Sequence, residues 1–262
     1  MLFLNGAKKI TLFSAILLIL STNVHRAMGE YNCAGSRETD CENIKRARAT
    51  PHGKFIRLNS DILKFEGHIQ RGSYEKYLEA VDNEIRILVI NSPGGDSYDG
   101  VRIGLDLQKR GIDLVVDGVA GSSAANYLFT AGRRKTICRG FVGFHGNAGA
   151  VKEEKRLEES IRSSAVKAGL SREQIEKVFK ETMAVAAETI RLEKEFFGKL
   201  GVSQKLFEIT QRDAKGLPPD LGLDFEFLLP SIYTMEKFGI GNVEGRQNIE
   251  LAELLGLKVI YY

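Results

Sequence analysis

Hydrophobic residues along the middle of the chain follow two alternating patterns, one typical of buried strands and one typical of helices. Continuous runs rich in Ile, Leu and Val occupy 85–92 and 112–120, as expected for strands covered on both faces. Strand–helix–strand units that repeat at this pitch predict an α/β fold with a parallel sheet and right-handed crossovers. The expected strands are 62–69, 85–92, 112–120 and 135–145, and the expected helices are 72–82, 101–111 and 122–132.

The pattern changes to long charged helices over 151–200, which we interpret as a helical extension of a single α/β domain covering 53–262. Ser171 is the expected N-cap of the main helix. The charges are most simply a solvated face. The apolar positions of the main helix allow two interpretations, packing on the protein's own core or self-association into a homo-oligomer. These positions are Val178, Phe179, Ile190, Phe196 and Phe197.

The first 29 residues have the anatomy of a secretory signal peptide. Lys8 and Lys9 precede an apolar run over 10–20, and small residues follow it at 27–29. This run of 11 residues is short of the roughly 20 that a spanning helix needs. We therefore expect an exported, periplasmic protein, with an uncleaved membrane anchor as the alternative.

Charge gives no reason to expect nucleic acid or anionic lipid as a partner. The net charge of +3 comes from the leader, because three of the 37 basic residues lie in 1–29 and the remaining 34 match 34 acidic residues.

Residues 30–52 are polar and predict an N-terminal tail. In an exported protein the nearby pair Cys33 and Cys41 predicts a disulfide in this tail, with Cys138 reduced and buried. Neither ligand spacing nor accompanying histidines indicate zinc, and we expect no metal and no cofactor.

Several common motifs are missing from the sequence. It contains no GxxxxGK[ST], no GxGxxG after a strand and no HExxH, and the GxSxG elbow of α/β-hydrolases is missing around Ser122 and Ser123. The usual signals for nucleotide binding and zinc proteolysis are therefore absent.

Small residues follow two neighbouring strands of the expected sheet. Gly94 and Gly95 follow the first, and Ser122, Ser123 and Ala124 follow the second. Sites in parallel sheets form at the carboxyl ends of strands. Glycine N–H groups and the N-terminus of the following helix could together form an oxyanion hole. A tight turn is the alternative for the glycine pair alone.

A nucleophilic serine needs a base, and His145 is the best placed histidine beyond the leader. It ends the strand region that follows the serine helix, so in a parallel sheet it emerges at the same edge as Ser123. A structural role is the alternative for a histidine at a strand end.

The segments INSPGGDSYDG, GVAGSSAANYLFTAG and VGFHG resemble the proteolytic subunit of the Clp protease. The wider superfamily includes signal peptide peptidase A and the crotonases, and exported Clp-subunit-like proteins are the most similar group. This resemblance implies repeated ββα units with a parallel sheet. It implies Ser123 as nucleophile, in register with Ala131-Gly132, and His145 as base. Its implied oxyanion donors are the N–H groups of Gly95 and Ala124, with Gly94 and Ser122 beside the substrate.

The family's third catalytic residue, an aspartate, falls on Phe227 when counted back from Gly239. Asp224 is our candidate for this role. The alternatives in the same segment are Glu226, Asp220 and Asp213.

The function expected from these features is an exported serine peptidase or acyl hydrolase that acts on a peptide or protein. The alternative is a catalytically silent member that binds a peptide or protein partner in the same groove. Export counts against a crotonase-type acyl-CoA reaction and separates the chain from the Clp ATPase, so no ATPase partner is expected. A Ser/Lys dyad is a further variant, but no lysine is better placed than His145.

Overall fold

The computed structural model describes residues 31, 33, 37–150, 154–209 and 227–262. The chain divides into two compact units, Met1–Ala34 and Gly35–Tyr262, and the second contains all the helices and strands considered below. The predicted signal peptide lies outside the described residues. In the part of the chain that is described, no helix is both long enough and apolar enough to cross a membrane.

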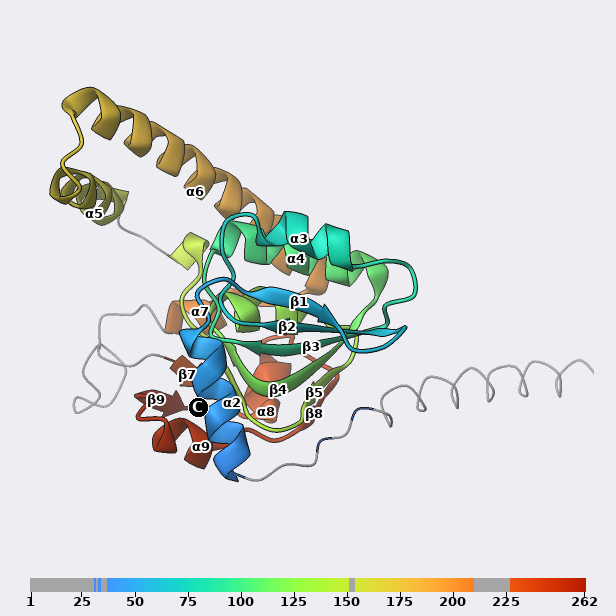
Figure 1. The fold of residues 1–262 in the computed structure, drawn as a ribbon. Coiled ribbons are helices and arrows are strands. Elements are labelled where there is room, and N and C mark those ends of the chain that lie inside the picture. Colours follow the sequence, from blue (N-terminus) through green and yellow to red (C-terminus); the bar gives the residue numbers. More distant parts are fainter. Residues whose placement is uncertain (1–30, 32, 34–36, 151–153, 210–226) are drawn as a thin grey trace, which may run out of the picture. The chain divides into compact units, whose positions relative to one another are not determined.

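A seven-stranded sheet with the order β1-β2-β3-β4-β5-β8, and with β6 also paired to β4, forms the centre of this unit (Figure 1). Only the β1–β2 pair of this sheet is antiparallel; the pairings that join β2 to β3, β4, β5, β6 and β8 are parallel. The predicted α/β fold with a mostly parallel sheet is confirmed. The strands are β1 Lys54–Arg57, β2 Ile62–Glu66, β3 Ile87–Ser92, β4 Asp113–Gly121, β5 Lys135–Ile137, β6 Phe141–Gly143 and β8 Val243–Gly245; a separate parallel pair comprises β7 Phe227–Leu229 and β9 Val259–Tyr261.

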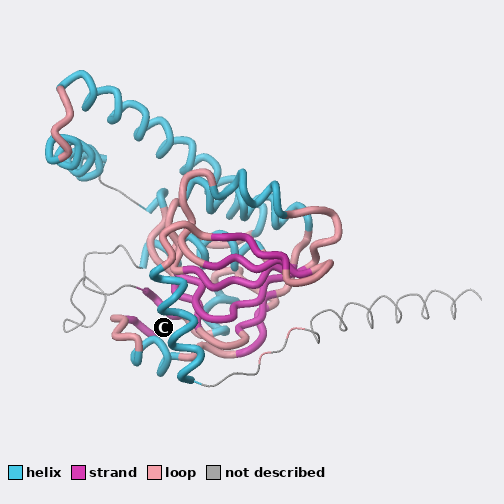
Figure 2. Tube along the Cα trace, in the orientation of Figure 1, coloured by secondary structure: helices cyan, strands magenta, loops and turns pink. Residues whose placement is uncertain are grey.

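Helices lie on both sides of the strands (Figure 2). On one side α4 packs on α3, on α6 and on the π-helix η1, and on the other side α2 packs on β3, β4 and α9. The helices are α2 Arg37–Ala49, α3 Ser73–Ala80, α4 Ser97–Arg110, η1 Ala124–Phe129, the 3-10 helix η2 Ala148–Ala150, α5 Glu154–Lys167, α6 Arg172–Leu200, α7 Lys205–Ile209, α8 Ile232–Lys237 and α9 Ile249–Leu254.

This two-sided cover explains why β3 and β4 lack an alternating pattern, since every residue of both strands is buried. Leu114 and Val116 of β4 belong to the large core beneath α3, α4, η1 and α6. Val119 of the same strand belongs to a second cluster, which includes Ile44 of α2 and Leu251 of α9. Burial of apolar side chains on both faces is the main stabilising contribution to such a sheet.

Helix α2 corrects two predictions for the segment 30–52. Residues 37–49 are helical and packed on the sheet, so the predicted polar tail is wrong there. Cys41 lies on this helix with a free thiol and packs against the second cluster, whereas Cys33 and Cys138 are disulfide-bonded. The predicted Cys33–Cys41 disulfide and the predicted reduced Cys138 are therefore wrong, because the helix directs the Cys41 thiol into packing.

The predicted helical extension is present as α5 and the 29-residue α6. Ser171 caps α6 with a capping box, as predicted. Phe196 and Phe197 are buried in the protein's own core. These two residues cannot contribute to a subunit interface, which corrects part of the basis for self-association. A homo-oligomer stays a prediction that would depend on positions such as Ile190, which is 43% exposed.

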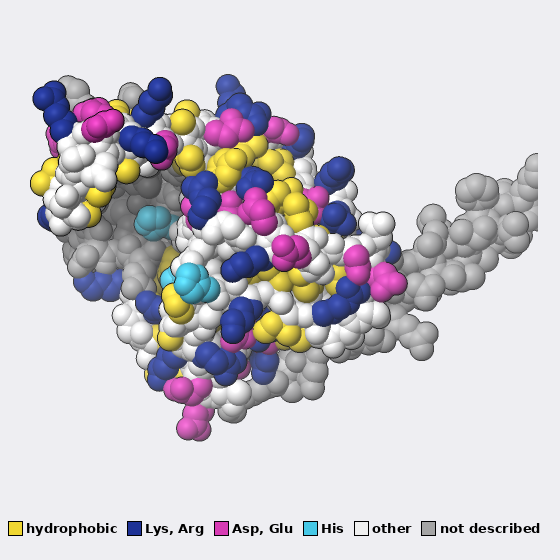
Figure 3. Space-filling model, turned by 45° about the horizontal axis from the view of Figure 1, so that its top comes forward, with side chains coloured by type: hydrophobic (Ala, Val, Ile, Leu, Met, Phe, Trp, Pro, Cys, Tyr) yellow, Lys and Arg dark blue, Asp and Glu magenta, His cyan; other side chains and the backbone are white. Residues whose placement is uncertain are grey.

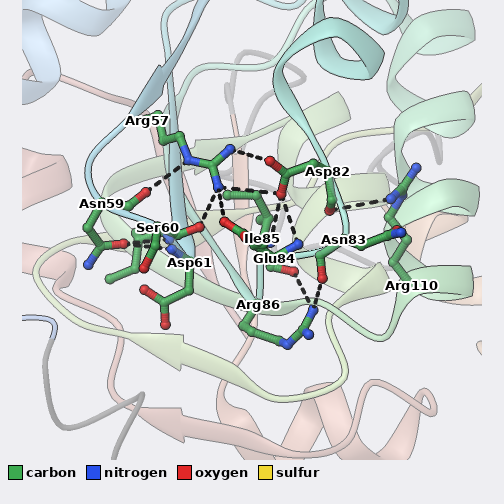
Figure 4. Close-up of polar contacts among 11 residues, drawn as sticks. Arg57, Asn59, Ser60, Asp61, Asp82, Asn83, Glu84, Ile85, Arg86 and Arg110 are labelled. Carbon is green, nitrogen blue, oxygen red and sulfur yellow. Dashed lines mark hydrogen bonds and ion pairs between the residues drawn. The ribbon is translucent and has the colours of Figure 1, made fainter.

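Polar contacts of Arg57 stabilise the loops at the amino ends of the parallel strands (Figure 4). Its guanidinium donates to Asp82 at 2.5 Å and to the carbonyl oxygen of Ser60 at 2.5 Å, and it also pairs with Glu84. The hydrogen bond from Arg57 holds the pKa of Asp82 at about 2. These contacts tie the β1–β2 turn to the α3–β3 connection, at the edge opposite the carboxyl ends of the parallel strands.

Lys135, at the start of β5, is 5% exposed, and its Nζ donates to the carbonyl oxygens of Gly132 and Gly241 at 2.7 and 3.0 Å. Burial lowers the pKa of Lys135 to about 8 from 10.5. Between these pH values the unfolded chain keeps a proton that the folded protein has lost, so stability rises with pH. We expect the free energy of unfolding to rise by about 3 kcal/mol from pH 8 to pH 10.5 relative to Lys135→Met. Urea unfolding of both proteins across this range measures the difference, and parallel pH profiles would contradict it.

Candidate active site

The register between β4 and β6 brings the predicted serine and histidine to one edge of the sheet. Gly121 pairs with Gly143 in this parallel ladder. Ser123 and His145 each lie two residues beyond this pair, and the N–H of Ser122 donates to the carbonyl oxygen of Gly143 at 2.9 Å. The prediction that both residues emerge at the same carboxyl edge is therefore confirmed at the level of the backbone.

Ser123 is the N-cap residue of η1 and is 2% exposed. Its hydroxyl donates to the carbonyl oxygen of Gly95 at 2.8 Å and lies 3.3 Å from Oγ of Ser97. The Ser123 side chain therefore does not cap the helix. π-Helical turns are rare in proteins, and those that occur often lie at functional sites.

Ser122 has a φ of 48°, in the left-handed region. Its side chain makes no hydrogen bond to any residue that the structure describes, so the Ser122 hydroxyl does not cap η1. The left-handed turn separates the directions of the two adjacent side chains, and only the Ser123 hydroxyl contacts the glycine pair.

The positions of Gly94 and Gly95 leave no room for a side chain. Gly94 and Gly95 have φ values of 96° and 140°. A Cβ on Gly94 would lie 2.8 Å from the N atom of Ser123, and a Cβ on Gly95 would lie 2.1 Å from the carbonyl oxygen of Ile69. Because both residues lack a Cβ, the loop can lie this close to Ser123 and Ile69.

Two backbone N–H groups at this point have no partner among the described residues. The N–H of Gly94 donates to Oγ of Ser92 at 3.1 Å, but no acceptor pairs with the N–H of Gly95. Ala124 is the first residue of η1, so its N–H has no acceptor within the helix. These are the two N–H groups predicted as oxyanion donors.

His145 is exposed, and its backbone is fixed to the serine helix. Nδ2 of Asn126 donates to the carbonyl oxygens of His145 and Gly146 at 3.0 and 3.4 Å. Partial desolvation lowers the pKa of His145, and a backbone hydrogen bond with Gly146 raises it by less. The lowered pKa favours the neutral imidazole, the state that a general base requires.

The catalytic hydrogen bonds themselves are not assembled in the described part of the chain. The Ser123 hydroxyl is directed to Gly95, and no hydrogen bond joins it to the His145 ring. Catalytic hydrogen bonds are often long or unformed without substrate. Asp224, Glu226, Asp220 and Asp213 all lie outside the described residues.

Phe227 occupies the place that the family resemblance assigns to the acid. It begins β7, whose Leu228 exchanges two backbone hydrogen bonds of 2.8 Å with Phe144. The Phe227 ring fills the space above Gly121 and Gly143. An apolar ring therefore lies over the glycines that precede Ser122 and Phe144.

Sequence reasoning missed Glu193, a fully buried carboxylate on α6. It accepts a short hydrogen bond from the Tyr127 hydroxyl and bonds of 2.9 and 2.8 Å from the N–H groups of Ala148 and Gly149. Burial raises the pKa of Glu193 despite these donors. The position of Glu193 in the sequence gave no signal of a buried role, because it is one of many acidic residues on a helix whose charges we interpreted as solvated.

Other chemistry receives less support from the described residues. The one buried lysine among them is Lys135, at the amino end of β5, which argues against a Ser/Lys dyad with Ser123. His68 bonds through Nε2 to the carbonyl oxygen of Arg48, which is a structural role. No group of three His, Cys, Asp or Glu side chains in the described part of the chain is arranged to hold a metal ion.

Basic and acidic side chains are interspersed over the described residues on the face drawn in Figure 3. This face has no extended patch of a single charge among those residues, which agrees with the balanced charge beyond the leader.

Comparison with known proteins leaves the family open. No family model matches the chain, and no curated protein matches it. A solved structure of a probable enoyl-CoA hydratase/isomerase from Mycobacterium abscessus is similar to it with a TM-score of 0.33 and 12% identity, over 78% of this chain and 73% of that chain. Similarity at this level carries no argument about fold or activity.

Proposed function

We propose that this protein is an exported serine hydrolase that cleaves a peptide or another acyl substrate, with Ser123 as nucleophile and His145 as general base. The observation that carries the proposal is the register between β4 and β6. Gly121 pairs with Gly143, and Ser123 and His145 each lie two residues after this pair, at the carboxyl edge of the sheet. The cysteines that are disulfide-bonded, Cys33 and Cys138, support export because disulfides persist in oxidising compartments.

The reaction would begin when the Ser123 hydroxyl leaves the Gly95 carbonyl oxygen and turns toward the substrate. His145, whose lowered pKa favours the neutral form, takes the hydroxyl proton as Oγ attacks the acyl carbon. The N–H groups of Gly95 and Ala124 then donate to the developing oxyanion. His145 returns the proton to the leaving group, and water completes hydrolysis of the acyl-enzyme by the same route.

An acid would orient the His145 ring, and Asp224 is the first candidate for it. Loss of such an acid lowers the rate of a serine hydrolase strongly without abolishing catalysis. Asp224→Asn is therefore expected to reduce the hydrolysis rate while the nucleophile still reacts with a probe.

Labelling with a fluorophosphonate probe tests this proposal directly. The purified protein is incubated with the probe, and the modified residue is mapped by mass spectrometry. An adduct on Ser123 that forms only in folded protein supports a hydrolase. Absence of any serine adduct in folded protein would overturn it.

A catalytically silent binding protein is the second candidate. The observation that favours it is the resting position of the Ser123 hydroxyl, which is buried and donates to Gly95. For such a protein we expect no adduct on Ser123, together with saturable binding of peptides at the same edge, measured by calorimetry.

A further inference from the structure

A chain of polar side chains leads from Ser123 to the buried carboxylate of Glu193. Oγ of Ser97 lies 3.3 Å from Oγ of Ser123, and the Ser97 side chain also interacts with the Tyr127 hydroxyl. The Tyr127 hydroxyl donates to Glu193. Every member after Ser97 is fully buried, so the end of this chain is shielded from solvent.

The same carboxylate holds the loop that follows His145. One Glu193 oxygen accepts from Tyr127 and from the N–H of Ala148, and the other accepts from the N–H of Gly149. These amides are three and four residues beyond His145. Asn126 holds the same loop one step earlier, through the carbonyl oxygens of His145 and Gly146.

We propose that Glu193 is a positioning residue of this site, which fixes the His145 loop relative to Ser123 through Tyr127 and the amides of Ala148 and Gly149. The inference rests on the proposed hydrolase function. A buried carboxylate that accepts three hydrogen bonds is costly to desolvate, and apolar packing of α6 on α4 would not require it. Its contacts join the two segments that must meet for Ser123 to be activated.

Glu193→Gln is the principal variant. Glutamine has nearly the same shape, but its amide NH₂ would face one of the donors that the carboxylate now accepts. We expect the rate of probe labelling at Ser123 to fall at least about tenfold, because the His145 loop loses its anchor. The exchange rate of the Ala148 and Gly149 amides with deuterium is expected to rise by a similar factor.

The pH profile separates positioning from general support of the fold. Desolvation lowers the pKa of His145, so a loosened and more solvated loop is expected to move the midpoint of the labelling profile upward. A variant that only loses stability would keep the wild-type midpoint when measured well below its melting temperature.

Tyr127→Phe and Glu195→Gln complete the experiment. Tyr127→Phe removes the link toward Ser97 but leaves both amide bonds, so labelling is expected to slow without faster amide exchange. This variant also tests the proposal if Glu193→Gln fails to fold. Glu195 is on the same helix with a side chain 38% exposed and pairs with Lys199, so Glu195→Gln should match wild type in both measurements.

The outcomes keep this inference distinct from the proposed function. If wild-type protein is labelled and Glu193→Gln is labelled at the same rate with the same midpoint, the role of Glu193 is overturned while the hydrolase stands. If wild-type protein is not labelled, the hydrolase is overturned. Faster amide exchange in Glu193→Gln would then still support the anchoring of the loop, and unchanged exchange would refute it.

Discussion

Replacing Ser123 with alanine is expected to abolish labelling by a fluorophosphonate probe and any esterase or peptidase turnover, whereas replacing Ser122 should leave most of both. Of these two serine hydroxyls, only that of Ser123 contacts the glycine pair, through its 2.8 Å bond to the carbonyl oxygen of Gly95. Mass spectrometry of the labelled proteins and turnover of an activated ester measure the two losses.

Stability measurements on the same pair provide the control. Ser123→Ala leaves the Gly95 carbonyl oxygen without its donor, at a cost of about 1 kcal/mol in the free energy of unfolding. Ser122 has no hydrogen-bond partner for its hydroxyl among the described residues, so Ser122→Ala should change this quantity by less than about 0.5 kcal/mol. Labelling that survives in Ser123→Ala and disappears in Ser122→Ala would refute the assignment.

The central strands could be predicted because their environment leaves a direct trace in the sequence. Both faces of β3 and β4 are covered, so each strand carries a run of consecutive Ile, Leu and Val residues in place of an alternating pattern. Small residues after each strand then located the site, since glycine and serine are required where backbone segments approach closely. Positive φ at Gly94 and Gly95 gives the physical reason for this composition.

Helix α2 could not be recognised as part of the domain because seven of its 13 residues are charged. Among its described side chains, the buried ones are Asp40, Ile44 and Ala47, at spacings of four and three. That spacing is a helical signal, but a short one in a segment that otherwise resembles a polar tail. The error about Cys41 followed from this one, since a cysteine on a packed helix is held away from its neighbours in sequence.

The parts of the candidate site that depend on distant contacts were also beyond sequence reasoning. Glu193 and Tyr127 are 66 residues apart, and nothing in either local pattern indicates that they meet. The π-helical form of η1 is equally hidden, because its sequence fits an ordinary helix. The order of the strands placed Ser123, His145 and Gly95 at one edge of the sheet, because each lies shortly after a strand. The family resemblance then selected Ser123 rather than Ser122 as the nucleophile.

Replacing Gly95 with alanine is expected to remove both activity and much of the protein's stability. A Cβ at this position would lie 2.1 Å from the carbonyl oxygen of Ile69, where a φ of 140° is already unfavourable for any residue with a side chain. We expect the free energy of unfolding to fall by about 3 kcal/mol or more, since backbone strain alone costs about 1 to 3 kcal/mol. The shift needed to relieve the contact also moves the Gly95 N–H, so probe labelling of the remaining folded protein should be lost.

Gly198→Ala is the matched control for this change. Gly198 lies in α6, and a Cβ added there would have no atom within 4 Å outside its own helix turn, so alanine meets no obstacle. Alanine favours a helix over glycine, and we expect a gain of about 0.5 to 1 kcal/mol with unchanged labelling. Urea unfolding measures the change in stability of the two variants, and the rate of probe labelling measures the change in activity. If Gly95→Ala were as stable and as readily labelled as Gly198→Ala, the close approach of this loop to Ile69 would not be what holds the oxyanion donor beside Ser123.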